Sequence, residues 1–165
     1  MKSRVTATFK HKKPKFWNEF TAHFKDIPQV AVGFPKGEAT SAQYPDGTSV
    51  VDVAFWNNYG TKNEEGGVAI PARRFMDIAG KKSTLELGNV IKKLIPKVND
   101  GKIKFKDVAE IVGQKAVAIF KREITELSEP PNAPATIAKK GSSNPLIDTG
   151  LMRQTVTFDI RGNKE

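Results

Sequence analysis

The sequence predicts an α+β domain in which helices pack on one face of an antiparallel or mixed β-sheet. Segments near both ends of the chain alternate apolar and polar residues, as strands with one buried face do. The segments between them repeat apolar residues every three or four positions, which is typical of helices that bury one stripe. Because neither repeats nor a break in composition divide the sequence, we expect a single domain over residues 1–165.

The first part of the chain contains two predicted strands and one predicted helix. Residues 5–9 alternate apolar and polar side chains and predict a first strand. Residues 14–27 begin with a proline and carry aromatic and aliphatic side chains at spacings of three and four, so we expect an amphipathic helix that Pro28 ends. Residues 30–34 alternate again and predict a second, short strand.

The next segment predicts a turn followed by a short helix. Residues 38–49 are rich in Gly, Pro, Thr, Ser and Asp, and the run Pro45–Gly47 is typical of a tight turn, so we expect a loop or hairpin tip. Apolar residues fill most of positions 50–59, which predicts a helix that Gly60 terminates. Residues 61–68 are expected to form a loop.

Two longer helices are predicted in the middle of the chain. Regular structure is expected to resume at residues 71–78, and apolar residues recur at helical spacing over residues 87–95 until Pro96 interrupts the pattern. The second helix is the most clearly periodic element. Asp107 can cap it, and its apolar stripe runs to Leu127.

A proline-rich segment and a strand are predicted after these helices. Residues 129–144 contain three prolines and too few apolar side chains to pack alone, so we expect a long flexible arm or loop at about residues 129–146. Asp148 or Thr149 can cap one turn of helix. Residues 155–161 alternate and predict the last strand.

The composition excludes several kinds of site. The chain has no cysteine, so it has no disulfide, thiolate nucleophile or thiolate metal ligand. Its two histidines, His11 and His23, lie in a lysine run and an apolar stripe, without a partner at metal-binding spacing, and we expect no cofactor or metal. No apolar run approaches the roughly 20 residues that cross a bilayer, and no signal peptide is recognisable, so we expect a cytoplasmic location.

The charge leaves a basic nucleic-acid-binding module open as an alternative function. Lys and Arg number 27 against 18 Asp and Glu, and the resulting net charge of +9 favours acidic partners. Much of this charge, however, sits in short lysine runs that are typical of solvated surfaces. The aromatic residues fall on stripes expected to be buried rather than between the basic residues, which is unfavourable for stacking on bases.

One motif is similar to a catalytic sequence. Residues 146–150, Leu-Ile-Asp-Thr-Gly, match the way in which an aspartic protease presents its catalytic carboxylate. That chemistry needs two such aspartates that share a proton, so a chain with one motif must dimerise and build most of a β-barrel after it. Only residues 151–165 follow the motif. Helix capping by Asp148 or Thr149 is therefore favoured, and we expect no enzymatic activity.

Three blocks of sequence, taken in order, resemble the tail-completion and neck proteins of tailed bacteriophages, the broad group that includes the lambda-like minor tail protein Z. Residues 53–61, Val-Ala-Phe-Trp-Asn-Asn-Tyr-Gly-Thr, are similar to its pattern of alanine, a polar pair, an aromatic residue, glycine and threonine. Residues 70–75, Ile-Pro-Ala-Arg-Arg-Phe, are similar to its isoleucine–proline–x–arginine–proline–phenylalanine turn. The third block covers residues 131–152. Asn58 stands where Glu is common in the group, and Arg74 where Pro is common.

The residues of the second block also suggest a local structure. Pro71 can begin a helix with Arg73 and Arg74 projecting and Phe75 turned inward. Arginine is favoured at interfaces for its planar fork of donors, so Arg73 and Arg74 are candidates for contact with a neighbour.

The resemblance implies a structural virion protein that forms a ring, commonly hexameric, which completes or terminates the tail and joins it to the head–neck connector. The implied partners are other copies of the chain, the tail-tube protein and the neck or head–tail connector protein, with genome DNA in the channel as a further contact. The implied location is the tail or neck of the virion, and the host cytoplasm during assembly. A ring needs a heterologous interface between neighbours, and a long arm is suited to reach across it. The residues expected at that interface are Arg73, Arg74, Pro131, Asn132, Pro134, Thr136, Ile137, Lys139 and Lys140.

Overall fold

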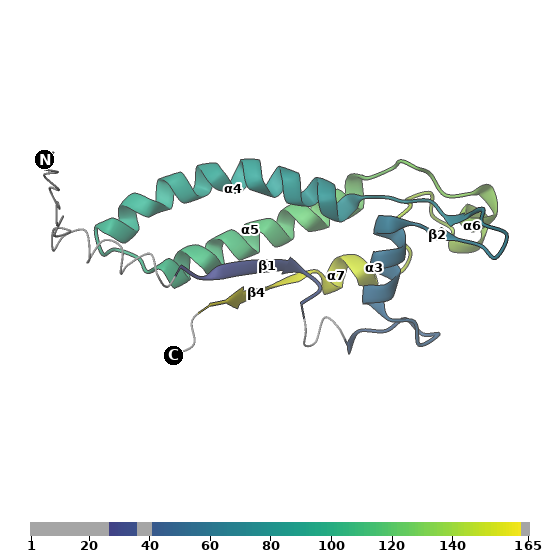
Figure 1. Cartoon of the computed structure of the whole chain (residues 1–165), viewed down its shortest axis with the longest axis horizontal. Helices are drawn as coiled ribbons and strands as arrows, with labels where there is room; N and C mark the ends of the chain where they lie inside the picture. Colours follow the sequence, from purple (N-terminus) through teal and green to yellow (C-terminus); the bar gives the residue numbers. More distant parts are fainter. Residues whose placement is uncertain (1–26, 36–40, 163–165) are drawn as a thin grey trace, which may run out of the picture.

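The protein is a mixed α+β structure, as the sequence predicts. The computed structural model describes residues 27–35 and 41–162. Two long helices, α4 (Phe75–Asn99) and α5 (Phe105–Glu126), lie antiparallel along the long axis of the molecule (Figure 1). Packing between these two helices makes the largest interface between elements of the described chain.

A two-stranded antiparallel sheet packs against α5 on the side away from α4 (Figure 1). Its strands are β1 (Gln29–Gly33) and β4 (Thr157–Arg161), paired so that the first residue of β1 lies opposite the last residue of β4. Inward residues of β4 are partly buried and alternate with exposed ones. The strands predicted at residues 30–34 and 155–161 are therefore confirmed, whereas the strand predicted at residues 5–9 lies outside the described residues.

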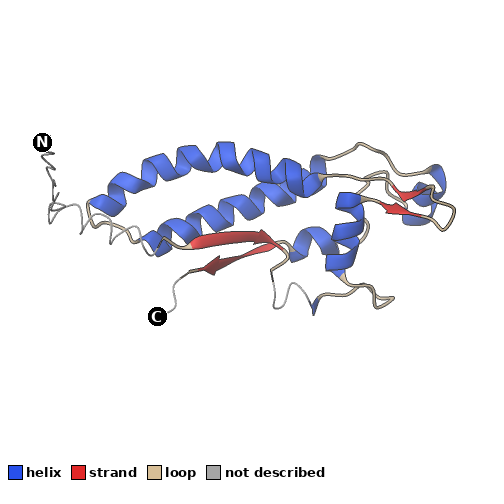
Figure 2. Cartoon of the chain, in the orientation of Figure 1, coloured by secondary structure: helices blue, strands red, loops and turns tan. Residues whose placement is uncertain are grey.

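The smaller elements gather at one end of the long helices (Figure 2). They are the helices α3 (Val50–Tyr59), α6 (Pro134–Lys140) and α7 (Leu151–Thr155) and the hairpin of β2 (Thr61–Lys62) and β3 (Val68–Ile70). Of the helices predicted in the first half of the chain, the one at residues 50–59 is confirmed. The one at residues 14–27 falls, but for its last residue, outside the described part of the chain.

A glycine sets the distance between α5 and the sheet. Gly113 is buried in α5, and a Cβ atom built on it would lie 2.2 Å from Cδ2 of Phe158 in β4. The ring of Phe158 thus occupies the space that a side chain at position 113 would need. Glycine inside a helix is unfavourable by about 1 kcal/mol relative to alanine, so the close approach of the ring gives a physical reason for glycine here.

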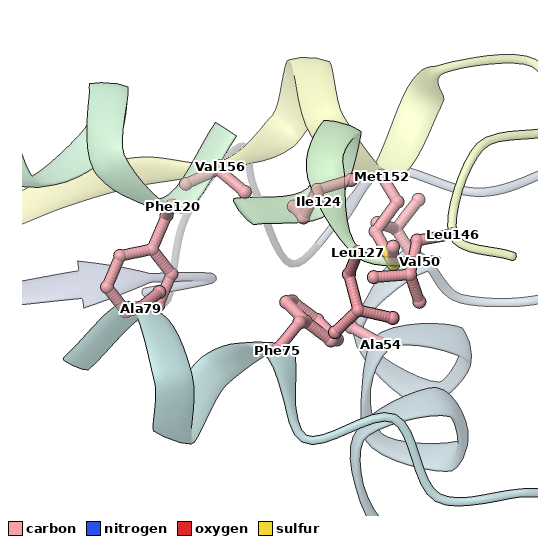
Figure 3. Close-up of a cluster of buried hydrophobic side chains, with 10 residues drawn as sticks. All are labelled: Val50, Ala54, Phe75, Ala79, Phe120, Ile124, Leu127, Leu146, Met152 and Val156. Carbon is pink, nitrogen blue, oxygen red and sulfur yellow. The ribbon is translucent and has the colours of Figure 1, made fainter. Parts of the chain in front are cut away.

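The hydrophobic core lies where α3, α7 and the adjoining ends of α4 and α5 meet (Figure 3). Phe75 at the start of α4 is fully buried and turned inward, as predicted. The buried cluster consists of Val50, Ala54, Phe75, Ala79, Phe120, Ile124, Leu127, Leu146, Met152 and Val156. Each helix in the described part of the chain is too short or too polar to span a bilayer.

Two helix boundaries differ from the predictions. Pro71 does not begin a helix, because residues 71–74 have no regular structure and α4 starts only at Phe75. Pro96 does not end α4, which continues to Asn99. Since Pro96 lies in the last turn, its missing N–H removes a single helical hydrogen bond, and its own carbonyl still accepts from the N–H of Asp100 (3.0 Å).

Three further details differ from the predictions. Asp107 is not the residue before α5 but lies in its first turn, where its carboxylate accepts from the backbone N–H of Lys104 (2.7 Å). Residues 61–68 are not simply a loop, since the β2–β3 hairpin includes them. The cap predicted before α7 at Asp148 or Thr149 is wrong, because the N-cap is Gly150 and no side chain caps the helix; the hydroxyl of Thr149, one residue earlier, accepts from the N–H of Leu151 (3.2 Å).

Candidate functional site

The candidate site is built around Arg73, which lies between β3 and α4. Its guanidinium reaches the proline-rich segment more than fifty residues further along the chain. Nε donates to the carbonyl oxygen of Pro130 (2.8 Å), and Nη2 donates to the carbonyl of Pro131 (3.1 Å) and to Oδ1 of Asn132 (3.1 Å). One planar fork thereby holds three consecutive residues in place.

The same arginine also binds the C-terminal half of α3. Its Nη1 donates to Oδ1 of Asn57 (3.2 Å), and its backbone N–H donates to the carbonyl of Asn57 (2.7 Å). The amide of Asn57 is oriented in turn by donation from Nδ2 to the carbonyl of Val53 (2.9 Å). Asn58 is fully buried, and its Oδ1 accepts from the N–H of Met76 in the first turn of α4 (3.0 Å).

Gly60 permits α3 to approach the segment that carries Arg73. Its φ of 77° lies in the left-handed region, and a Cβ atom at this position would be 2.9 Å from the carbonyl oxygen of Ile70 and 3.0 Å from the N of Ala72. Any larger residue would be strained in backbone and in space. The three blocks that carry the phage resemblance therefore meet at one point, with Asn57 and Gly60 from the first, Arg73 from the second and Asn132 from the third.

The surroundings of Arg73 correct the prediction that it projects toward a neighbour. The residue is only 4% exposed. Its partners in the described part of the chain are carbonyl and amide oxygens, and no hydrogen bond or ion pair there joins it to a carboxylate. Burial lowers the pKa of its guanidinium below the ordinary value. Arg74, in contrast, is exposed as predicted and lies 3.6 Å from a carboxylate oxygen of Asp77.

The proline-rich segment also differs from the expected arm. It contains α6, which begins with Pro134 and ends at Gly141 in the left-handed conformation, and its ends contact the rest of the chain. Asn144 is its main anchor, because its Nδ2 donates to the carbonyl of Thr125 at the end of α5 (2.9 Å) and its Oδ1 accepts from the N–H groups of Leu146 and Ile147. The composition of the segment did not predict this packing, because polar contacts through Arg73 and Asn144, together with the buried side chain of Leu146, hold the segment in place.

The residues expected at an interface differ in how far they are exposed. Arg73 and Asn132 are joined to each other inside the chain, and Pro131 contributes its carbonyl to the same contact. Ile137 and Lys140 are partly buried on α6. The residues that remain exposed are Arg74, Pro131, Pro134, Thr136 and Lys139.

A hollow of about 990 Å³ lies between α3, β3, α6 and the turn before α3. We call it the α3–α6 hollow. Trp56, Val68 and Leu146 supply apolar walls, and Arg73 contributes to its lining. Its charged lining residues outside Arg73 are Asp46, Lys139, Lys140 and Asp148.

The lining of the hollow contains both positive and negative side chains. Burial lowers the pKa of Lys140, while Asp148 acts in the opposite direction and Arg73 in the same direction. Hydrogen bonds from the backbone and side chain of Thr48 lower the pKa of Asp46. Burial, followed by the nearby Asp148, raises the pKa of Tyr44. With cations and carboxylates interleaved, the hollow suits a mixed protein surface better than a single strongly charged group.

The motif at residues 146–150 serves the fold in this structure. Leu146 is buried in the core, Asp148 is exposed, and the hydroxyl of Thr149 accepts from the N–H of Leu151 at the start of α7. Among the described residues, no group of three or more His, Asp or Glu side chains is placed to hold a metal ion. His11 and His23 lie outside these residues.

Sequence reasoning missed one exposed feature beside the hollow. Phe55, Trp56 and Tyr59 of α3 and Val68 of β3 are large apolar side chains that remain exposed, and we call them the aromatic face. The rings of Phe55 and Tyr59 lie 4.8 Å apart between centroids. The available signal was that seven of the ten residues of α3 are apolar, three of them aromatic, which is more than one buried stripe needs, whereas a surface helix usually has a polar outer side.

Comparison of the chain with protein-family models, with curated proteins and with solved structures finds no match.

Proposed function

We propose that the protein is a structural virion subunit of a tailed bacteriophage, which forms a ring that completes or terminates the tail and joins it to the head–neck connector. The observation that carries the proposal is the meeting of the three phage-like blocks at Arg73. Asn57, Arg73 and Asn132 are widely separated in sequence, yet hydrogen bonds at 3.1–3.2 Å join their side chains. The three blocks that resemble the phage proteins thus contribute to one structural contact.

The proline-rich segment is held at both of its ends. Arg73 fixes the segment at Pro130–Asn132, and Asn144 fixes its other end, so that α6 is held at a defined place beside α3. Every subunit of a ring must present the same pair of contact surfaces to its two neighbours, and a preorganised surface binds with a smaller loss of conformational entropy. In this proposal Arg73 positions the contact surface, while exposed residues such as Arg74 and Lys139 touch the partner.

The partners in this proposal are other copies of the chain, the tail-tube protein and the connector protein of the neck. No step of this function requires a bond to be made or broken. It needs a stable framework, an exposed apolar surface and matched charges, which are typical of assembly interfaces. The protein would act in the virion tail or neck, after assembly in the host cytoplasm.

Electron microscopy with polymerised tail tubes of the same phage tests the proposal. Copies of the protein should gather at one end of each tube and stop its elongation. Lys139→Glu should weaken this capping, because the side chain lies exposed on α6. Lys115→Glu reverses an exposed charge on α5 and is the matched control, which should cap as the unaltered protein does.

Two results would contradict the proposal. Tubes that continue to elongate in an excess of the folded protein would exclude a role in completing the tail. Binding along the whole side of the tube, rather than at an end, would exclude a ring at the tail end.

A further inference from the structure

Helix α3 has apolar side chains on opposite sides. Val50 and Ala54 face the core and are fully buried, while Phe55, Trp56 and Tyr59 lie on the outer side. Phe55 and Tyr59 are more than half exposed, and Val68, which lines the α3–α6 hollow together with Trp56, is 72% exposed. Large apolar side chains that gather on an exposed surface mark an interaction site. The aromatic face therefore has the character of a surface that a partner covers.

The segment that carries the aromatic face is acidic, although the hollow that Trp56 and Val68 also line contains both cations and carboxylates. Residues 50–70 contain three carboxylates, Asp52, Glu64 and Glu65, against the single Lys62, which gives this segment a net charge of −2. The three carboxylates are exposed, and the described part of the chain shows no ion pair to any of them. A partner that carries positive charge would complement this rim.

The opposite end of the molecule carries such a surface. The turn between α4 and α5 and its flanks, residues 92–106, contain six lysines against one aspartate, a net charge of +5, and we call this segment the lysine tip. Figure 1 shows the α4–α5 turn at one end of the long axis and α3 with β2 toward the other. Of these lysines, Lys102 is the one with an ion pair in the described structure, to Asp100 at 2.8 Å.

The lysine tip also offers apolar surface to an aromatic partner. Ile103 in the turn and Ile95 in the last turns of α4 are only partly buried, and Ile91, one turn before, is 37% exposed. Lysine side chains add long aliphatic stems, and their ammonium groups are attracted to the faces of Tyr, Trp and Phe rings. The tip therefore matches the aromatic face in apolar character as well as in charge.

We propose that the aromatic face of one copy binds the lysine tip of a second copy. Because the two surfaces differ and lie at opposite ends, the contact is heterologous, and each copy keeps one free surface on which the next copy binds. Repetition of this contact would link the copies in series and close them into a ring where the rotation allows. The inference rests on the proposed ring function, for which it names the surfaces between neighbours.

A complementation experiment with two variants tests the contact. The first, Phe55→Ser/Tyr59→Ser, removes exposed rings from the aromatic face and leaves the buried side of α3 unchanged. The second, Lys97→Glu/Lys104→Glu/Lys106→Glu, reverses exposed charges at the lysine tip. Circular dichroism should show that both variants keep their helices.

Sedimentation then distinguishes the arrangements. The unaltered protein should self-associate, and each variant alone should do so about tenfold more weakly or stay monomeric. Mixed together, the two variants should form heterodimers that grow no further, since each supplies the surface that the other lacks. Adding Asp52→Lys/Glu64→Lys/Glu65→Lys to the tip variant should restore its self-association.

Four outcomes would overturn the contact. The first is an unaltered protein that stays monomeric at its highest soluble concentration, and the second is a single-surface variant that associates as strongly as the unaltered protein. The third is a mixture of the two variants that remains monomeric. The fourth is a variant with charges reversed on both surfaces that does not regain self-association. A tip variant that assembles normally but loses salt-sensitive binding to duplex DNA would assign the lysines to nucleic acid instead.

The same proteins separate this inference from the proposed function. If the variants behave as expected but the unaltered protein never binds tail tubes, the contact stands and the tail function fails. If both variants still form complete caps on tail tubes, the tail function stands and the contact fails.

Discussion

Replacing Gly113 with alanine gives the sharpest test of the packing between α5 and the sheet. In most helix interiors this change stabilises a protein by about 1 kcal/mol, because alanine loses less conformational entropy on folding. At Gly113 the new Cβ atom would lie 2.2, 2.5 and 2.6 Å from three ring atoms of Phe158. Carbon atoms attract best at about 3.5–4.0 Å, so the ring must move by roughly 1 Å.

The gain in helix propensity and the clash with Phe158 act in opposite directions, and their relative sizes predict whether Gly113→Ala stabilises or destabilises the protein. Overpacking of a filled site costs about 1–3 kcal/mol, and three simultaneous contacts below 3.0 Å at Gly113 place this change in the upper part of that range. After the gain in helix propensity, we expect Gly113→Ala to lower the free energy of unfolding by about 1–2 kcal/mol. Urea unfolding followed by circular dichroism at 222 nm measures this difference.

Two controls isolate the clash with Phe158. Gly88 lies inside α4 with nothing within 4 Å of a Cβ atom, so Gly88→Ala should stabilise the protein by about 0.5–1 kcal/mol. In a Phe158→Leu background, the loss caused by Gly113→Ala should shrink, because the ring is absent. The reasoning would be refuted if Gly113→Ala stabilised the protein as much as Gly88→Ala does.

Three further predictions concern the Arg73 contact, the end of α4 and the turn before α3. Arg73→Lys keeps the positive charge but lacks the planar fork of donors, so we expect the free energy of unfolding to fall by about 1–3 kcal/mol. Amide hydrogen exchange over residues 129–146 should become faster, and unchanged exchange there would contradict the role of Arg73. Pro96→Ala should stabilise α4 by about 1 kcal/mol in thermal unfolding, since it restores one helical hydrogen bond, and a lower melting temperature would oppose this. Because the folded pKa of Asp46 lies below its unfolded value, its contribution to stability is present above the unfolded pKa and disappears as the pH falls through the folded one. NMR titration of the carboxyl should therefore give a pKa below 3.8, and a value above it would refute the hydrogen bonds from Thr48.

Local patterns predicted the elements well where one residue type dominated the outcome. The stripe that ends at Leu127 predicted α5, and Gly60 marked the end of α3, since only glycine fits its backbone angle and the nearby Ile70 carbonyl. The alternation in residues 155–161 predicted β4. Boundaries were less certain, because Asp107 can cap from the first turn of a helix as well as from the residue before it.

The candidate site was only partly predictable. The sequence singled out Arg73 and Asn132, and the structure joins them, but inside one chain rather than across an interface. An arginine side chain is usually exposed. Its burial depends on carbonyl oxygens at Pro130 and Pro131, which no local pattern reveals.

By itself, the sequence determined the α+β class, the positions of the main helices and the two paired strands, and the absence of thiol chemistry, because these follow from residue type and near-neighbour spacing. Only the tertiary structure decided that the proline-rich segment folds back onto Arg73 and that α3 turns Phe55 and Tyr59 outward. The physical reason is that burial and hydrogen bonding are settled between segments distant in the chain. Which side of a mostly apolar helix faces the core depends on the surfaces that surround it.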